Sequence, residues 1–171
     1  MNCDGWEKTV SETLRGDSLW KMKAYRLALF VGDLGWHDVT KLMQDKRTLD
    51  MADQLYRALG SISANIAEGY SRSTGKDRAR FFEYSLGSAR ESREWYHKGC
   101  HVLGDPVADH RLQLLTEIIC LLTVTIPDQR ERDRIRPLRE PSASYNTSVS
   151  DDAGDDDHLA ALLRNVPMPD L

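Results

Sequence analysis

Apolar residues recur at intervals of three or four positions in four segments of this chain, and polar residues fill the positions between them. The first two segments are residues 18–34 and 48–69, and the second has the spacing that forms the seam of a helical bundle. The other two are residues 76–103 and a segment that begins at Pro106. A half-buried strand would alternate apolar and polar residues, so this spacing predicts four α-helices. Residues 36–46 either continue the first helix or form a short separate one.

Short polar segments connect the predicted helices. Residues 71–75 join the second helix to the third, and residues 104–106 end the third and begin the fourth. We expect Gly69 to close the second helix in a left-handed conformation. Short connections place neighbouring helices antiparallel, so the predicted fold is all-α, an antiparallel up-down-up-down four-helix bundle over residues 18–136. A flexible N-terminal segment, residues 1–17, is expected to precede it.

The fourth helix carries a second apolar stripe beside the first. A helix in a monomeric bundle needs one such stripe, so the second indicates either a wide core face or a contact with another subunit. On the latter interpretation the oligomer interface consists of Leu114, Ile118 and Leu121.

Charge is distributed unevenly along the chain. The net charge is −4, but residues 137–171 contain two arginines and seven acidic residues, a local net charge of −5, so the rest of the chain is close to neutral. This region is rich in Ser, Asp, Ala and Pro, and we expect a disordered acidic tail. Within it, residues 158–164 form a short amphipathic motif. Its leucines either dock into a groove on a partner or have no role; these are Leu159, Leu162 and Leu163.

The hairpin between the second and third helices carries the most distinctive residues. Facing positions have numbers that sum to about 146, so Ser61 should face Ser85, and Ala58 should face Gly87 and Ser88. These small residues would let the two backbones approach closely. The polar members are expected to hold the hairpin rather than to catalyse a reaction. The structural signature comprises Gln54, Ser61, Asn65, Glu68, Gly69, Gly87, Ser88 and Glu91.

This signature, together with Lys76, Asp77 and Phe81, resembles that of the 23S rRNA intervening-sequence protein family of four-helix bundles. The resemblance covers about residues 18–126. It implies a homopentamer, and it implies kinship with the accessory variability determinant of diversity-generating retroelements. That protein binds nucleic acid and partners a reverse transcriptase.

Basic residues are concentrated in and before the third helix. Residues 71–98 contain seven basic and four acidic residues, and a fivefold ring would repeat this excess as a positive band able to hold phosphates. The alternative is a solvated helix face of mixed charge. The candidate nucleic-acid-binding residues are Arg72, Lys76, Arg78, Arg80, Arg90, Arg93 and Lys98.

Motifs for catalysis are missing from the sequence. It contains no Gly-rich phosphate loop, no arguable Ser-His-Asp set and no paired carboxylates in an evident cleft. His97, Cys100 and His101 share one helical turn, but no fourth ligand has a convincing spacing, so no metal is expected. We expect no cofactor and no enzymatic activity.

We therefore expect a non-enzymatic, homopentameric adaptor that binds RNA or DNA, or an enzyme of nucleic acids such as a reverse transcriptase. The alternative is a scaffold whose ring displays the C-terminal tails to an effector protein without binding nucleic acid. The three cysteines are odd in number and widely spaced, and the chain has neither an apolar signal core nor a run long enough to span a membrane. These features predict a cytoplasmic protein.

Overall fold

The computed structural model describes residues 2–135 and 156–170. Within these ranges every regular element is helical, so the all-α prediction is confirmed. In chain order the elements are α1 (Cys3–Thr9), α2 (Glu12–Arg15), η1 (Ser18–Lys21), α3 (Lys23–Leu42), η2 (Lys46–Thr48), α4 (Leu49–Tyr70), α5 (Gly75–Leu103), α6 (Asp105–Ile135) and α7 (Asp156–Arg164).

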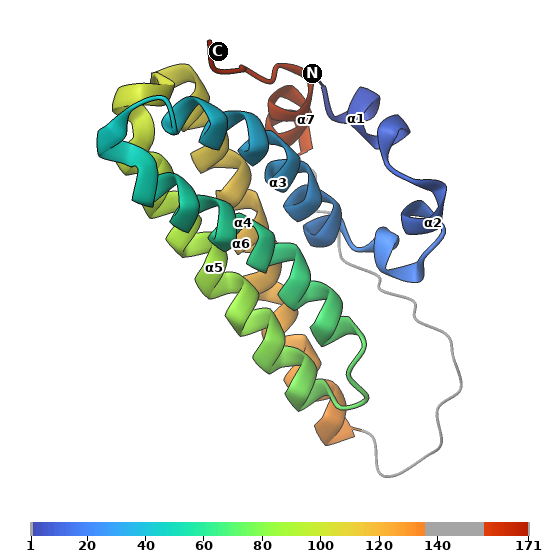
Figure 1. Ribbon diagram of the computed structural model, residues 1–171. Helices are drawn as coiled ribbons and strands as arrows, with labels where there is room; N and C mark the ends of the chain where they lie inside the picture. Colours follow the sequence, from blue (N-terminus) through green and yellow to red (C-terminus); the bar gives the residue numbers. More distant parts are fainter. Residues whose placement is uncertain (1, 136–155, 171) are drawn as a thin grey trace.

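Four long helices, α3 to α6, pack side by side along most of their length (Figure 1). We refer to these four helices as the bundle. The first predicted helix begins later than expected and continues through the ambiguous residues 36–46 as far as Leu42. At the start of α5, the Thr74 hydroxyl accepts a hydrogen bond from the Asp77 backbone amide at 3.1 Å and donates one to the Asp77 carboxylate at 2.9 Å. This cap satisfies an amide that has no partner within the helix.

Two glycines permit close helix packing. A Cβ on Gly35 of α3 would lie 2.4 Å from a terminal methyl group of Leu59 on α4. A Cβ on Gly69 would lie 2.9 Å from Cβ of Phe81 and 2.9 Å from the Phe82 ring, both on α5. Gly69 lies inside α4 and does not have a positive φ, so the expected left-handed end of this helix is wrong. Position 69 requires a glycine because Phe81 and Phe82 on α5 leave no space for a Cβ there.

The pairing of α4 with α5 agrees closely with the predicted register. The buried Ser85 hydroxyl donates a hydrogen bond to the backbone oxygen of Ile62 at 2.9 Å, one residue from the expected position Ser61. Gly87, however, is exposed, and a Cβ there would meet open space. The expectation that Gly87 lies in the helix seam is therefore wrong. The rotation of α5 about its axis differs slightly from the predicted one, so Gly87 lies on the surface and not in the core.

The second apolar stripe of α6 belongs to the protomer's own core. Leu114 and Ile118 are both 0% exposed, and Leu121 is half-buried. Helices α3 and α5 both contact α6, which therefore needs a wide apolar face. The assignment of Leu114 and Ile118 to a subunit interface is wrong, because these side chains have no surface to offer a partner.

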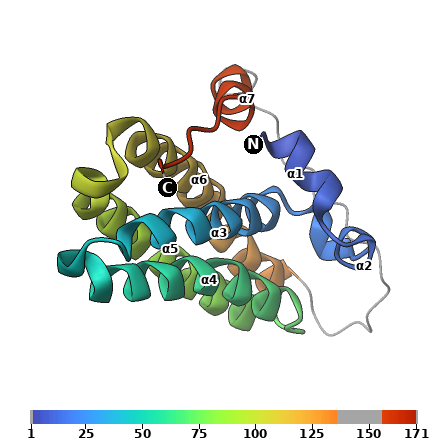
Figure 2. The ribbon, with the colours of Figure 1, turned by 45° about the horizontal axis from the view of Figure 1, so that its top comes forward.

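Both ends of the described chain pack against the bundle (Figure 2). Near the N-terminus, Trp6 is 4% exposed, contacts the Phe30 ring and donates a hydrogen bond from Nε1 to Asp33 at 2.5 Å. The expectation of a flexible segment over residues 1–17 is therefore wrong at Trp6. The Trp6 indole thus holds α1 against α3 through both its apolar ring and its N–H group.

The C-terminal segment also differs from expectation. Residues 156–164 form α7, which contacts α1 and α6, and Leu159 and Leu162 are buried while Leu163 is half-buried. The expectation that these leucines have no core to join is wrong. The part of the predicted acidic tail in residues 137–155 lies outside the described residues.

Candidate functional site

A buried charge network joins three helices of the bundle. Arg111 on α6 donates from Nε to Oδ2 of Asp38 on α3 at 2.8 Å and from Nη2 to Oδ1 at 3.2 Å. The Tyr96 hydroxyl on α5 donates to Asp38 Oδ2 at 2.7 Å. The side chains of Arg111 and Asp38 are 0% exposed. Two parallel hydrogen bonds from one guanidinium to one carboxylate both neutralise and orient the buried charges.

His110 extends this network toward the C-terminal segment. Its Nδ1 accepts a hydrogen bond from Arg111 Nη1 at 2.8 Å, because a guanidinium can only donate. Nε2 therefore carries the ring proton and donates to the backbone oxygen of Leu162 at 2.7 Å. Burial, followed by the repulsion from Arg111, lowers the pKa of His110 against the opposing effects of the Leu162 carbonyl and Asp38. The geometry and the charge both favour the neutral imidazole.

Tyr96 is held in its neutral form. Burial raises its pKa well above the ordinary value, and the neighbouring Asp38 carboxylate raises it further. The phenol acts as a hydrogen-bond donor to Asp38, which already accepts two hydrogen bonds from Arg111. Because these three side chains are 0% exposed, the network serves to position helices. Sequence reasoning missed it, although Arg111 stands next to the apolar stripes of α6, which is a signal for a buried pair.

Four of the seven candidate nucleic-acid-binding residues lie on one exposed face of α5. Their separations of 4, 10 and 8 residues keep them within a sector of about 80° around the helix, given 3.6 residues per turn. We call this set the basic face of α5; it consists of Lys76, Arg80, Arg90 and Lys98. Two carboxylates share the sector and are paired. Glu83 with Arg130, and Glu94 with Lys98, form ion pairs on the exposed surface.

The remaining three candidates, Arg72, Arg78 and Arg93, lie in different environments, and Arg72 contacts an aromatic ring at the tip of the hairpin. Arg78 is half-buried and donates to Gln129 of α6 at 2.9 Å and to the backbone oxygen of Arg72 at 2.8 Å, so it holds the end of the hairpin. Arg93 is exposed beside a shallow hollow whose other lining residues are Arg90, Glu94, His97 and Leu112.

At the tip of the α4–α5 hairpin, two arginines flank one aromatic ring. The Arg72 guanidinium lies 4.5 Å and that of Arg80 lies 5.5 Å from the centre of the Phe81 ring. Tyr84 meets the same ring edge-on at 5.8 Å and is 52% exposed. Arg72 also forms an ion pair with Glu68. We call this group the tip cluster: Arg72, Arg80, Phe81 and Tyr84.

The other polar signature residues mostly make contacts within their own helices. Asn65 donates to the backbone oxygen of Ser61 at 2.8 Å, and Glu91 accepts a hydrogen bond from Trp95 Nε1 at 3.3 Å. Ser88 donates to the backbone oxygen of Tyr84 at 3.1 Å, and Gln54 is exposed. These contacts do not join α4 to α5, so they do not hold the hairpin as expected, and they form no reactive constellation.

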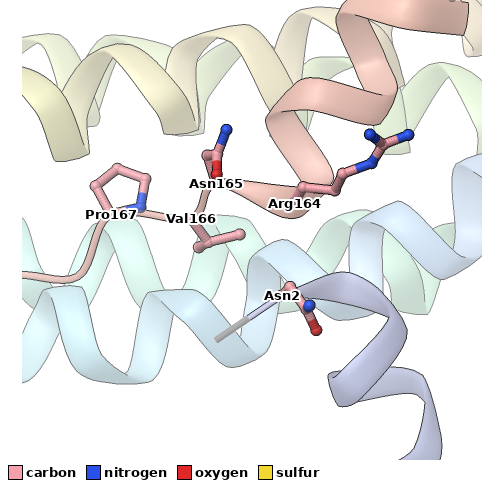
Figure 3. A pocket seen from close by; sticks show the side chains of 5 residues that line it. All are labelled: Asn2, Arg164, Asn165, Val166 and Pro167. Carbon is pink, nitrogen blue, oxygen red and sulfur yellow. The ribbon is translucent and has the colours of Figure 1, made fainter.

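A second hollow borders the C-terminal segment. Arg164, Asn165, Val166 and Pro167 line it on one side and Asn2 on the other, as the labelled side chains in Figure 3 show. It is open, and the lining carries one charged side chain. We assign no ligand to it.

Neither a metal-binding cluster nor a membrane-spanning helix occurs in residues 2–135 and 156–170. No three His, Cys, Asp or Glu side chains in these ranges come together as a metal site. No helix in the same ranges is long and apolar enough to cross a membrane.

A comparison with protein families matches the central part of the chain. The model of the 23S rRNA-intervening sequence protein family matches residues 21–124, which include the network residues Asp38, Tyr96 and Arg111 and the whole of α5. Searches of curated proteins and of solved structures each found no match. Since the family match spans more than half of the sequence, the chain belongs to the 23S rRNA-intervening sequence protein family.

Proposed function

We propose that this protein is a non-enzymatic, homo-oligomeric adaptor that binds RNA through the basic face of α5. The observation that carries the proposal is the alignment of Lys76, Arg80, Arg90 and Lys98 on one exposed side of a single helix. From Lys76 to Lys98 the face extends about 33 Å at 1.5 Å per residue. That length matches several successive phosphates of a nucleic-acid backbone.

The tip cluster supports the same proposal. Its exposed Tyr84 offers a ring to an unpaired base, and the two guanidinium groups that lie over the adjoining Phe81 ring would contact phosphates. Stacking of bases on aromatic side chains next to basic residues is the usual means of binding single-stranded nucleic acid. A site at one end of the basic face would fix the position of a bound strand.

Oligomerisation strengthens the proposed interface. The basic face of one protomer includes two carboxylates, Glu83 and Glu94, so its net charge is modest. Repetition around a homopentamer would multiply this charge and let several weak contacts act together. A reverse transcriptase or another enzyme of nucleic acids would be a suitable partner for such an adaptor.

Charge reversal tests the proposal directly. The triple variant Lys76→Glu, Arg80→Glu and Arg90→Glu should lower RNA affinity at least 100-fold in fluorescence anisotropy at low salt, because three phosphate contacts are lost. A matched control makes the same charge change at exposed positions off this face: Lys8→Glu, Lys46→Glu and Arg57→Glu. Undetectable binding of the wild type to RNA, or equal loss in both triple variants, would overturn it.

One observation favours a second candidate function, a protein scaffold. Trp36 on α3 and Tyr56 on α4 are 60% and 46% exposed, and their rings meet edge-on at 6.0 Å. Met43 and Leu49 at the same end of these helices are also exposed. An exposed aromatic pair is typical of a protein interface. If Trp36→Glu and Tyr56→Glu abolish assembly while wild-type protein binds no RNA, the scaffold is the better description.

A further inference from the structure

Residues 156–170 lie against α1 and the first part of α6, and we call the surface that they cover the groove. Leu159 is 4% and Leu162 is 9% exposed, and Leu163, Val166 and Met168 pack against the core of the protein. This segment, which we call the C-terminal clasp, thus places one face of a short helix and a following extended stretch against the protein.

The clasp's two polar anchors come from its backbone. The Leu162 oxygen accepts a hydrogen bond from His110 at 2.7 Å, and the Pro167 oxygen accepts one from Arg111 at 3.0 Å. The Leu162 carbonyl belongs to the last turn of α7, where carbonyls have no partner within the helix and the helix dipole is negative. The groove therefore offers two donors to the clasp: His110 to a carbonyl in the last turn of α7, and the cationic Arg111 to a carbonyl of the stretch that follows the helix.

The apolar core of the bundle is made by its own helices. The buried apolar residues of α3 to α6 lie between Ala24 and Ile126, and the match to the family model ends at residue 124. The clasp lies beyond both limits. It is connected to Ile135, the end of α6, by 20 residues, 136–155.

The length of that connection allows the clasp to reach more than one groove. His110 and Ile135 lie on the same helix, about 37 Å apart at 1.5 Å per residue. Twenty residues span up to about 70 Å when extended. The connection is therefore longer than the distance within one protomer requires, and it is long enough to reach a protomer packed alongside.

We propose that the groove beside His110 and Arg111 is a peptide-binding site for residues 156–170, and that a second copy of the chain can supply this segment in trans. The site recognises a leucine-bearing helix by one carbonyl of its last turn and by one carbonyl of the stretch that follows it. Exchange of clasps would connect protomers without any additional interface. This inference is independent of the proposed binding of RNA.

A labelled synthetic peptide of residues 156–170 tests the proposal on the full-length chain. The receptor is the variant Leu159→Asp with Leu162→Asp, whose own clasp should be released because two buried leucines become charged. Its matched control is His158→Asp with Ala161→Asp, which adds the same charges at the same spacing on the exposed side of α7.

Fluorescence anisotropy should show saturable peptide binding to the released variant. Binding to the wild type and to the control should be at least tenfold weaker, because a tethered clasp competes at an effective concentration near millimolar. A peptide carrying aspartate in place of Leu159 and Leu162 should not bind. Failure of the natural peptide to bind the released variant, with the helical circular dichroism signal retained, would overturn the proposal.

Hydrogen exchange provides a test that needs no variant with a buried charge. In the wild type, amides in α7 should be protected, but they should exchange at least tenfold faster than those in α4 and α5, because release of the clasp leaves the bundle folded. Mixing wild-type protein with excess peptide should increase the exchange of the tethered α7. Equal exchange rates in α7 and α5 would show that the clasp is a fixed part of the fold and would contradict exchange in trans.

Discussion

Arg111 on α6 and Asp38 on α3 form a two-point hydrogen-bonded ion pair, at 2.8 and 3.2 Å, with both side chains completely buried. The two residues are 73 positions apart. The pair connects α6 to α3, the helix against which the N-terminal segment packs through Trp6. The Arg111 guanidinium also donates to the C-terminal clasp, so one arginine joins α6 to two other parts of the fold, α3 and the clasp.

Removing one partner of this pair should be strongly destabilising. Asp38→Ala leaves Arg111 buried without its carboxylate, and we expect the free energy of unfolding to fall by about 3–5 kcal/mol in urea denaturation. The double variant Asp38→Leu with Arg111→Met should be more stable than Asp38→Ala, since no charge then stays buried. Equal stability of the wild type and Asp38→Ala would show that the pair contributes nothing to the fold.

The two helical glycines Gly69 and Gly87 should respond in opposite ways to alanine. Gly69→Ala introduces a Cβ 2.9 Å from Cβ of Phe81, so α4 and α5 must separate, at a cost of about 1–3 kcal/mol. Gly87→Ala meets open space and should stabilise the protein by about 0.5–1 kcal/mol through helix propensity. The melting temperatures of the two variants measure both effects. A shift of both melting temperatures in the same direction would contradict the register of α4 against α5.

The attachment of the C-terminal clasp should weaken in mildly acidic solution. Because the pKa of His110 is lowered in the folded state, the stability it contributes is complete above the ordinary value of 6.5 and declines as the pH falls through the lowered pKa. Protonation would place an N–H of His110 against the Arg111 guanidinium, while Asp38 is already paired to Arg111.

Hydrogen exchange of α7, corrected for the intrinsic pH dependence of amide exchange, should therefore show lower protection at pH 5.5 than at pH 7.5. The released variant Leu159→Asp with Leu162→Asp should show no such difference. Protection of α7 that stays constant across this range would contradict the role of His110.

The cysteines should differ in reactivity by their environments. Burial raises the pKa of the Cys3 thiol to about 11, with Glu7 and Asp4 adding to the effect, whereas Cys120 is exposed. Since the thiolate is the reactive form, alkylation of the native protein at pH 8 should modify Cys120 at least tenfold faster than Cys3. Mass spectrometry of a time course measures both rates. Denaturation should remove the difference, and equal native rates would mean that α1 does not stay packed on the bundle.

Assembly can be measured separately from stability. Five protomers of 19.5 kDa would give about 98 kDa in light scattering. Trp36→Glu should reduce this mass without unfolding the protomer if the exposed aromatic pair lies in an interface, whereas Leu114→Glu should unfold it because Leu114 is in the core. A monomer at micromolar concentration would remove the ring from the proposed function.

The sequence by itself determined the four long helices and one helix pairing, but not α1 and α2, which lie in residues expected to be flexible. Apolar spacing located α4 and α5 within one residue at each end, and the sum rule for the hairpin placed Ser85 within one residue of its true partner. These features depend on local periodicity and on a short connection, both of which are visible along the chain.

Tertiary structure alone decided which faces meet which neighbours. Periodicity gives the phase of an apolar stripe but does not say whether a stripe such as that of Ile118 is covered by the same chain or by another. It also cannot pair Asp38 with Arg111, or seat Leu162 against His110, because each contact depends on how separate helices pack in space. The basic face of α5 could be anticipated from charge, but only the packing of α5 on α6 decided that Arg78 binds Gln129 while Arg93 stays exposed beside Arg90.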